Sequence, residues 1–188
     1  MQRCGWVSTD PLYQRYHDHE WGNAQTQNSV LFEMLCLEGQ QAGLSWITVL
    51  KKRENYRAAF HQFDPQAVAL MDEADIDRLM LDSGLIRHRA KLNAIVANAR
   101  AYLTMQENGE DFSHFIWSFV AGQPQINHFA DGAEVPAQTA TSLALSKALK
   151  KRGFKFVGST ICYAFMQACG LVNDHIITCF RHPVNQRY

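Results

Sequence analysis

A stripe of apolar residues at helical spacing constrains the fold of this chain more than any other feature. The stripe consists of Leu92, Ile95, Val96, Ala99 and Leu103. Residues three and four apart lie on one face of an α-helix, and Asn108-Gly109 supplies a stop signal at the end of the segment. A helix in a protein depends on neighbours that cover its apolar face. The sequence therefore predicts a core helix that runs from Arg87 to about Gly109.

Helix start and stop signals recur along the rest of the chain. The expected helix caps are Ser29, Ser45, Asp64, Asp72 and Asp111. Gly43 separates the first two helices, Pro65 follows the third cap, and Gly84 ends the fourth helix. Strand-like alternation around a hairpin dipeptide is missing from the sequence. We therefore predict an all-α, multi-helix globular domain, with a loop over residues 123–140.

Size, charge and cysteine content narrow the class of protein. At 188 residues with 47% hydrophobic residues, the chain can bury one full core, so we expect a single domain over residues 1–188. Its net charge is zero, so any binding of nucleic acid has to rest on a local basic patch. The sequence has neither a signal peptide nor a membrane-spanning run, which predicts a cytoplasmic protein without a membrane partner. Its five cysteines are then expected to be metal ligands or buried thiols.

Residues 142–170 resemble a helix-hairpin-helix motif, because two helical patterns flank a turn bounded by Gly153 and Gly158. Glycines let such a turn approach a phosphate, and the free N–H groups near Ser159 can bind an anion. The turn also lies beside a group of cations: Lys150, Lys151, Arg152 and Lys155. This pattern predicts contacts to the DNA backbone, which carry no sequence information. An ordinary helical hairpin with a solvated basic face would show the same pattern.

Two pairs of cysteine and histidine residues lie near opposite ends of the chain. Cys4 and His17 precede most of the sequence, whereas His175 and Cys179, at i and i+4, are expected to project from one helical face. Two cysteines and two histidines form a closed zinc site that leaves no position for water. The alternative is that these are unrelated buried residues, since the spacing from Cys4 to His17 is wider than in common zinc fingers.

Three long segments follow one another along the chain: CGWVSTDPLYQRYHDHEWG, LFEMLCLEGQQAGLSWITVLKKRENYRAAF and KALKKRGFKFVGSTICYAFMQACGLVNDH. They resemble the bacterial 3-methyladenine DNA glycosylase I family of the helix-hairpin-helix superfamily. The resemblance implies base-excision repair, in which the N-glycosidic bond of 3-methyladenine in alkylated double-stranded DNA is hydrolysed and the free base is released without lyase activity. It also implies one structural zinc ion, held by Cys4, His17, His175 and Cys179, that joins the termini of a monomer. Residues 123–141 and the tail FRHPVNQRY are the least similar parts and are expected to carry none of the chemistry.

The resemblance also points to a pocket for the damaged base. A glycosylase extrudes its target base, stacks it on aromatic side chains and reads its edge. Trp6, Tyr13, Tyr16 and Trp46 supply aromatic faces, although core packing is an alternative for each, and Trp21 is expected to be structural. Methylation at N3 leaves the base positively charged, so Glu38 is expected to bind it and to stabilise the charged transition state. The alternative for Glu38 is a solvated carboxylate on a helix.

Two further residues have divided interpretations. Leu44 can fill the gap that the extruded nucleotide leaves in the duplex, or it can be buried in the core. Asp174 lies where many helix-hairpin-helix glycosylases have a catalytic aspartate, but it also precedes His175. Capping the last helix or supporting the metal site is therefore an equally good interpretation of Asp174.

Two other classes of protein are weighed against a glycosylase. A noncatalytic DNA-binding module has no need for Glu38 beside a group of aromatic residues. A zinc-dependent hydrolase needs an exchangeable coordination position, which four protein ligands would deny.

Overall fold

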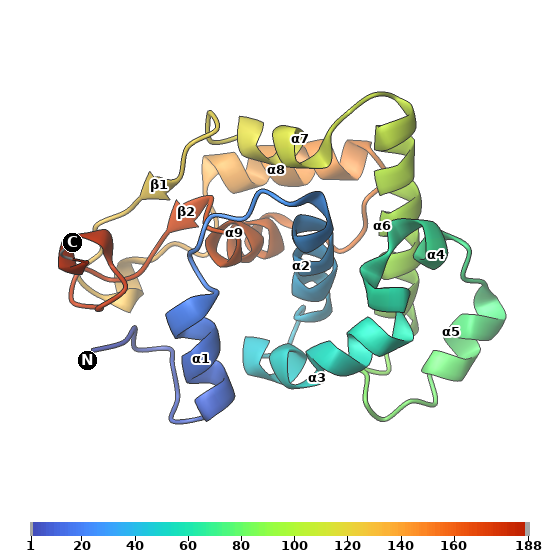
Figure 1. The fold of residues 1–188 in the computed structure, drawn as a ribbon, viewed down its shortest axis with the longest axis horizontal. Helices are drawn as coiled ribbons and strands as arrows, with labels where there is room; N and C mark the ends of the chain where they lie inside the picture. The colour runs from blue at the N-terminus through green and yellow to red at the C-terminus, as the bar shows by residue number, and fades with distance from the viewer. Residues whose placement is uncertain (1, 187–188) are drawn as a thin grey trace.

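The computed structural model describes residues 2–186, and helices make up most of it (Figure 1). The α-helices are α1 (Pro11–His19), α2 (Asn28–Gln40), α3 (Trp46–Ala59), α4 (Pro65–Ala69), α5 (Glu73–Leu79), α6 (Arg89–Glu107), α7 (Phe112–Ser118), α8 (Ala140–Lys151) and α9 (Ser159–Ala168). Short 3₁₀ turns are η1 (His61–Phe63), η2 (Gly132–Glu134) and η3 (Pro183–Asn185). The all-α prediction is confirmed. The two-residue strands β1 (Gln125–Ile126) and β2 (Val172–Asn173), which pair in parallel, are too short to give a sequence pattern.

Helix α2 lies at the centre of the fold, where it contacts α3, α6, α7 and α9 (Figure 1). Its residues from Met34 to Gln40 are all buried, and this continuous burial explains why α2 has no polar face. The long helix α6 covers one side of α2. The predicted apolar stripe on α6 is confirmed, with Leu92, Ile95 and Ala99 fully buried.

Side-chain caps fix several of the predicted helix starts. Asp64 Oδ1 accepts a hydrogen bond from Gln66 N at 3.1 Å, and Asp111 Oδ1 accepts one from His114 N at 2.7 Å. Asp72 forms a reciprocal capping box with Asp75. These three predictions are confirmed. Each cap satisfies an N–H group that would otherwise lack a partner at the helix start.

Neither serine caps a helix with its side chain: Ser29 lies inside α2, whereas Ser45 occupies the N-cap position of α3 as predicted. Helix α2 begins at Asn28, one residue before Ser29. Asn28 Oδ1 accepts a hydrogen bond from Ser113 N at 2.7 Å, so this side chain ties α2 to the start of α7. Ser45 does precede α3, but its hydroxyl bonds to Thr48 Oγ1 at 2.9 Å and caps no backbone N–H group.

Helices α8 and α9 pack against each other and form the predicted hairpin. The turn between them exposes Lys155 and buries Phe154 and Val157, so its apolar residues anchor it to the core. Gly153 has a φ of +93°, a left-handed conformation that favours glycine. The backbone expected for a helix-hairpin-helix is therefore present.

Both ends of the described chain lie on the same side of the molecule (Figure 1). Phe180 N donates a hydrogen bond to Gln2 O at 2.9 Å, which joins the two ends directly. The helix expected around His175 and Cys179 is wrong, because β2 extends the chain up to Asn173 and a turn follows. Asn173 Oδ1 accepts a hydrogen bond from His175 N at 3.2 Å, which stabilises that turn in place of a helix.

None of the helices formed by residues 2–186 combines the length and apolar character needed to cross a bilayer.

Candidate active site

A cavity of about 590 Å³ opens between the N-terminal segment, α1, the end of α2, the start of α3, α9 and the loop around η2. Its lining includes Trp6, Tyr13, Tyr16, Trp21, Glu38, Gln41, Trp46, Thr160, Tyr163, Gln167 and Asp174. The predicted catalytic residue, Glu38, therefore meets all four predicted stacking residues at one cavity, namely Trp6, Tyr13, Tyr16 and Trp46. This volume is within the range of small-molecule sites.

Glu38 is buried in the cavity wall, with 3% of its surface exposed, so the alternative of a solvated carboxylate is wrong. Within residues 2–186, Glu38 Oε2 has no hydrogen-bond partner. Burial raises the pKa of this carboxyl group from its ordinary value of 4.5 to about 8. A buried polar atom without a partner costs free energy, and a cationic group placed against Glu38 would remove that cost.

Trp46 carries the second unpartnered polar atom of this cavity. Its indole Nε1 is buried and finds no acceptor in the part of the chain that the structure describes. A ligand that suits the cavity therefore offers a hydrogen-bond acceptor to Trp46 and a positive donor to Glu38, between aromatic faces.

The aromatic side chains form two groups around the cavity. The rings of Tyr16 and Trp46 lie 5.5 Å apart at an angle of 44°, and both side chains are buried. Trp6 lies 5.0 Å from the rings of both Tyr13 and Trp21, and 38% of its surface is exposed. Burial, with Glu38 nearby, raises the pKa of Tyr16 and of Tyr13, so both phenols stay neutral near pH 7. The cavity thus presents flat, uncharged faces around one carboxyl group.

Trp21 also packs beside the cysteine and histidine cluster. Its ring lies 4.7 Å from that of His175, in an edge-to-face arrangement. Trp21 therefore forms part of both the cavity wall and the surroundings of the metal candidates, consistent with the structural role expected for it.

One expectation about the cavity is wrong. The sequence places residues 123–141 outside the chemistry, but Asp131, Gly132, Val135, Pro136 and Ala137 line the cavity. Pairing of β1 with β2 fixes the start of this loop, and Ala130 N donates to Glu134 Oε2 at 2.8 Å within it. A segment without periodicity gives no sequence signal for such tertiary placement.

Asp174 is buried and fully engaged. Its carboxylate accepts hydrogen bonds from Asn127 Nδ2 at 2.7 Å, Tyr163 Oη at 2.5 Å and Gln167 Nε2 at 2.8 Å. These bonds tie the loop after β1 and the segment before His175 to α9. No helix begins between Asp174 and His182, so the capping interpretation is wrong, and the geometry favours support of the metal candidates and the cavity wall.

Cys4, His17, His175 and Cys179 come together as a buried cluster whose possible ligand atoms lie within 4.8 Å of one another. Cys179 Sγ lies 3.5 Å from His17 Nε2 and 3.6 Å from His175 Nδ1, and Cys4 Sγ lies 3.6 Å from His175 Nδ1. Ligands about 2.0–2.3 Å from a tetrahedral zinc ion lie about 3.5 Å from one another. The four side chains therefore fit a metal ion.

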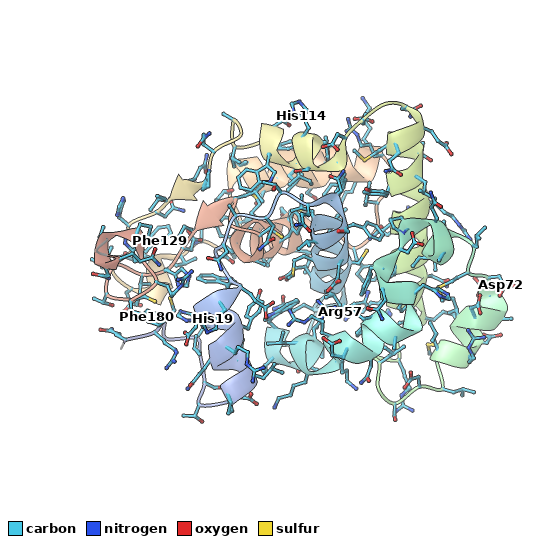
Figure 2. The ribbon with its side chains drawn as sticks, viewed as in Figure 1. His19, Arg57, Asp72, His114, Phe129 and Phe180 are labelled. Atoms are coloured by element: carbon cyan, nitrogen blue, oxygen red, sulfur yellow. The ribbon has the colours of Figure 1, made fainter. Side chains whose placement is uncertain are left out.

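Neighbouring groups orient these possible ligands. His17 Nδ1 lies 2.8 Å from Asp18 Oδ1, and His175 Nε2 donates to Trp21 O at 3.1 Å. Arg3 in turn holds Asp18, with Nη2 and Oδ2 2.7 Å apart. Each histidine thereby turns its other ring nitrogen towards the cluster, where it could coordinate a metal; His17 Nε2 also accepts a long hydrogen bond from Cys4 N at 3.4 Å. Phe180, labelled in Figure 2, lies beside the cluster, with its ring 6.1 Å from that of His17.

The predicted DNA-binding residues lie on two exposed turns. Leu44, on the turn between α2 and α3, is 42% exposed, so core burial is wrong for this residue. Lys155 is exposed on the hairpin, and a Cβ atom at Gly158 would meet nothing within 4 Å. The Ser159 hydroxyl bonds to the Gln138 side chain, but its backbone starts α9 as expected.

Arg152 is engaged within the protein. Its Nη2 lies 2.6 Å from Glu110 Oε2, and its guanidinium group stacks over the Phe115 ring at 4.2 Å. The positive charge expected beside the hairpin therefore comes from the exposed lysines, Lys150, Lys151 and Lys155.

Comparisons with known proteins agree with this geometry. A family model described as methyladenine glycosylase matches residues 6–182. Over 186 residues the chain is 66% identical to DNA-3-methyladenine glycosylase 1 of Escherichia coli (strain K12), covering 99% of this chain and 100% of that protein. A crystal structure of 3-methyladenine DNA glycosylase I has a TM-score of 0.96 and 67% identity, over 97% of this chain and 100% of the other.

A second crystal structure shows a single-residue variant of 3-methyladenine DNA glycosylase I in complex with 3-methyladenine. It has a TM-score of 0.92 and 42% identity, over 97% of this chain and 98% of the other. The sequence match, the shared fold and the cavity all lead to the same assignment. The chain belongs to the methyladenine glycosylase family.

Proposed function

We propose that this protein excises 3-methyladenine from alkylated double-stranded DNA by hydrolysing the N-glycosidic bond and releasing the free base. The observation that carries the proposal is the pair of unpartnered polar atoms, Glu38 Oε2 and Trp46 Nε1, inside an aromatic cavity. The relatives named above bear this activity in their names, and one homologous structure contains the base itself.

The charge of the damaged nucleotide suits Glu38. Methylation at N3 leaves adenine positively charged while it is attached to the sugar, and a cation close to Glu38 favours the ionised carboxylate in spite of its burial. The aromatic rings of Tyr16 and Trp46 add attraction between a cation and π faces. Neutral adenine gains neither interaction, so the cavity selects the damaged base.

Bond cleavage needs little acid catalysis. The glycosidic electron pair leaves with the base, which becomes neutral, and a water molecule adds to C1′ of the sugar and loses a proton. Glu38 is the catalytic residue, because its carboxylate contacts the base and stabilises the positive, oxocarbenium-like transition state. Extrusion of the nucleotide from the duplex into the cavity brings the base to this carboxylate.

The two exposed turns hold the DNA. Gly153, Gly158 and the N–H groups near Ser159 bind the phosphate backbone, and Lys155 adds positive charge. Leu44 enters the gap that the extruded nucleotide leaves. The protein binds DNA as a monomer in this proposal.

The metal in the cluster is proposed to be one structural zinc ion per chain. Cys4, His17, His175 and Cys179 would hold it, and a zinc ion bound by four protein ligands supplies cross-linking and no activated water. This argues against a zinc-dependent hydrolase. A noncatalytic DNA-binding module would not explain a cavity in which Glu38 Oε2 is buried without a partner among residues 2–186.

The decisive experiment is to incubate the protein with alkylated duplex DNA and to identify the released bases by chromatography. The parent is expected to release 3-methyladenine, and Glu38→Gln is expected to release far less. Glu33→Gln is the matched control, because it is the same substitution on α2 at a residue that pairs with Arg57 and does not line the cavity. If the parent releases no methylated base, the proposed function is wrong.

A further inference from the structure

Helix α6 carries two buried polar side chains within its apolar face. Lys91 is 5% exposed and Asn98 is 2% exposed. They are seven residues apart, close to two helical turns, so they lie on the same side of α6. Both hydrogen-bond to backbone atoms of the segments that carry the exposed turns.

Lys91 holds the end of α2. Its ammonium group donates to Gln40 O at 2.9 Å and to Ala42 O at 2.6 Å, and Gln40 Nε2 donates back to Lys91 O at 3.0 Å. The carbonyl groups at the end of a helix lack partners and carry partial negative charge, so a cation stabilises them. Leu44 follows Ala42 by two residues. Lys91 therefore fixes the base of the turn that presents Leu44.

Lys91 forms no ion pair within residues 2–186, and burial lowers its pKa. Burial of a charged group without an acidic partner is costly. An apolar side chain would fill the same space on α6 without that cost, so packing alone does not account for a lysine here.

Asn98 holds the hairpin between α8 and α9 in the same way. Its Oδ1 accepts a hydrogen bond from Lys155 N at 2.7 Å, and its Nδ2 donates to Lys155 O at 3.3 Å. The next residue, Phe156, has a φ of +53°, which is strained for a bulky side chain. By binding both sides of Lys155, Asn98 offsets this strain and fixes the hairpin.

The two anchored segments also meet. A Cβ atom added to Gly39 of α2 would lie 3.2 Å from Phe156 O, so the hairpin rests directly on the end of α2 beside Glu38. The Leu44 turn, the hairpin and the cavity thus share one junction, whose two polar anchors come from α6.

We propose that Lys91 and Asn98 are positioning residues that set the spacing between the Leu44 turn and the hairpin, so that both engage one DNA duplex. This inference rests on the proposed function, because it takes both turns to be DNA contacts. It assigns to α6 a role in DNA affinity, although neither residue lines the base cavity.

The test uses Lys91→Met and Asn98→Ala in the full chain, with Arg100→Met as the matched control. Arg100 lies on the same helix and donates to Ala69 O and Met71 O, both at 3.0 Å, so its loss frees carbonyl groups at the end of α4 instead. Binding is measured to a short duplex with one abasic-site analogue, and separately to free 3-methyladenine. Melting temperatures show the effect of each change on the fold.

We expect Lys91→Met and Asn98→Ala each to weaken duplex binding about tenfold or more, because small misplacements of binding groups are costly. Binding of free 3-methyladenine is expected to stay within about twofold of the parent. Single-turnover excision at saturating enzyme should recover towards the parent rate, whereas the half-saturating concentration rises. Arg100→Met is expected to leave both affinities unchanged.

Lys91→Gln and Asn98→Asp are graded variants that keep part of each anchor. They are expected to fall between the parent and the full substitutions, and they replace any full substitution that does not fold. Two outcomes overturn the proposal. In the first, the variants at Lys91 and Asn98 that bind free 3-methyladenine also bind the duplex as tightly as the parent. In the second, all four variants at these two positions lose affinity for the duplex and for free 3-methyladenine together. Failure of the parent to bind free 3-methyladenine would instead count against the proposed function.

Discussion

Cys179 Sγ lies 3.5 Å from His17 Nε2, although 162 residues separate the two in the sequence. A metal ion between them and their partners Cys4 and His175 would act as a cross-link between the ends of the described chain. We predict that the purified protein contains one zinc ion per chain and that a strong chelator lowers its melting temperature by about 5 °C or more. Elemental analysis and thermal unfolding measure both quantities.

The matched control for this prediction is Cys162→Ala, because Cys162 is a buried free thiol outside the cluster. The double variant Cys4→Ala with Cys179→Ala should lose the metal, and Cys162→Ala should keep it. An active protein without stoichiometric metal, or a double variant that melts with the parent, would contradict the prediction.

Glu38→Gln and Trp46→Ala are expected to impair excision by different routes. The first change removes a charge with little change of shape, so single-turnover excision should fall about a hundredfold while affinity for undamaged DNA stays the same. The second removes a stacking face, so binding of free 3-methyladenine should weaken by about 1–3 kcal/mol. If both folded variants match the parent in each assay, the site has been assigned to the wrong residues.

The raised pKa of Glu38 makes the stability of the protein depend on pH. The folded state binds the Glu38 proton more tightly than the unfolded state, whose carboxyl group titrates near its ordinary value of 4.5. Its contribution to stability is therefore complete below pH 4.5 and is lost as the pH rises towards about 8. Glutamine resembles the protonated acid, so Glu38→Gln should gain stability over the parent between pH 5 and pH 8.

Urea unfolding of the two proteins at a series of pH values measures this difference. The advantage of Glu38→Gln is expected to grow to a few kcal/mol and then to level off above the pKa of Glu38. A difference that stays constant over the whole range would show that Glu38 does not titrate as its burial implies.

Gly158→Leu is expected to weaken DNA binding without harming the fold. Gly158 has a φ of −63°, which any residue adopts, and a Cβ atom there meets nothing within 4 Å. A bulky side chain would then obstruct only a phosphate that approaches the start of α9, so affinity should fall for every DNA sequence alike. Binding of free 3-methyladenine is the internal control. Unchanged affinity for duplex DNA would remove the hairpin from the DNA interface.

Local signals in the sequence predicted much of the helical fold. Asp64, Asp72 and Asp111 cap helices as expected, because the interaction that defines a cap lies within a few residues. The stripe on α6 was equally clear, since burial of one face leaves a periodic pattern. Ser29 failed as a cap because Asn28 forms a bond with Ser113, 85 residues away, and such a partner leaves no local pattern.

The candidate site was predicted where aromatic residues and a carboxylate stand close in sequence, as for Glu38 and Trp46. The wall formed by residues 131–137 and the hydrogen bonds around Asp174 were missed, because both depend on tertiary contacts, among them the pairing of β1 with β2. Two-residue strands have no alternation to detect. The helix expected through His175 was wrong for the same reason, since β2 pulls the preceding backbone into an extended form.

The cavity has a consequence for synthesis of the protein. Cys4 and Trp6 line it at one end of the sequence, and Ile176 lines it at the other. His175 contacts Cys4 although 171 residues separate the two. A nascent chain therefore cannot complete the cavity until the segment that contains Asp174 and Ile176 has left the ribosome, even though α1 to α3 emerge early. Contacts of such long sequence separation carry a large loop-closure cost, which slows folding. Unfinished chains would thus be unable to capture a damaged base.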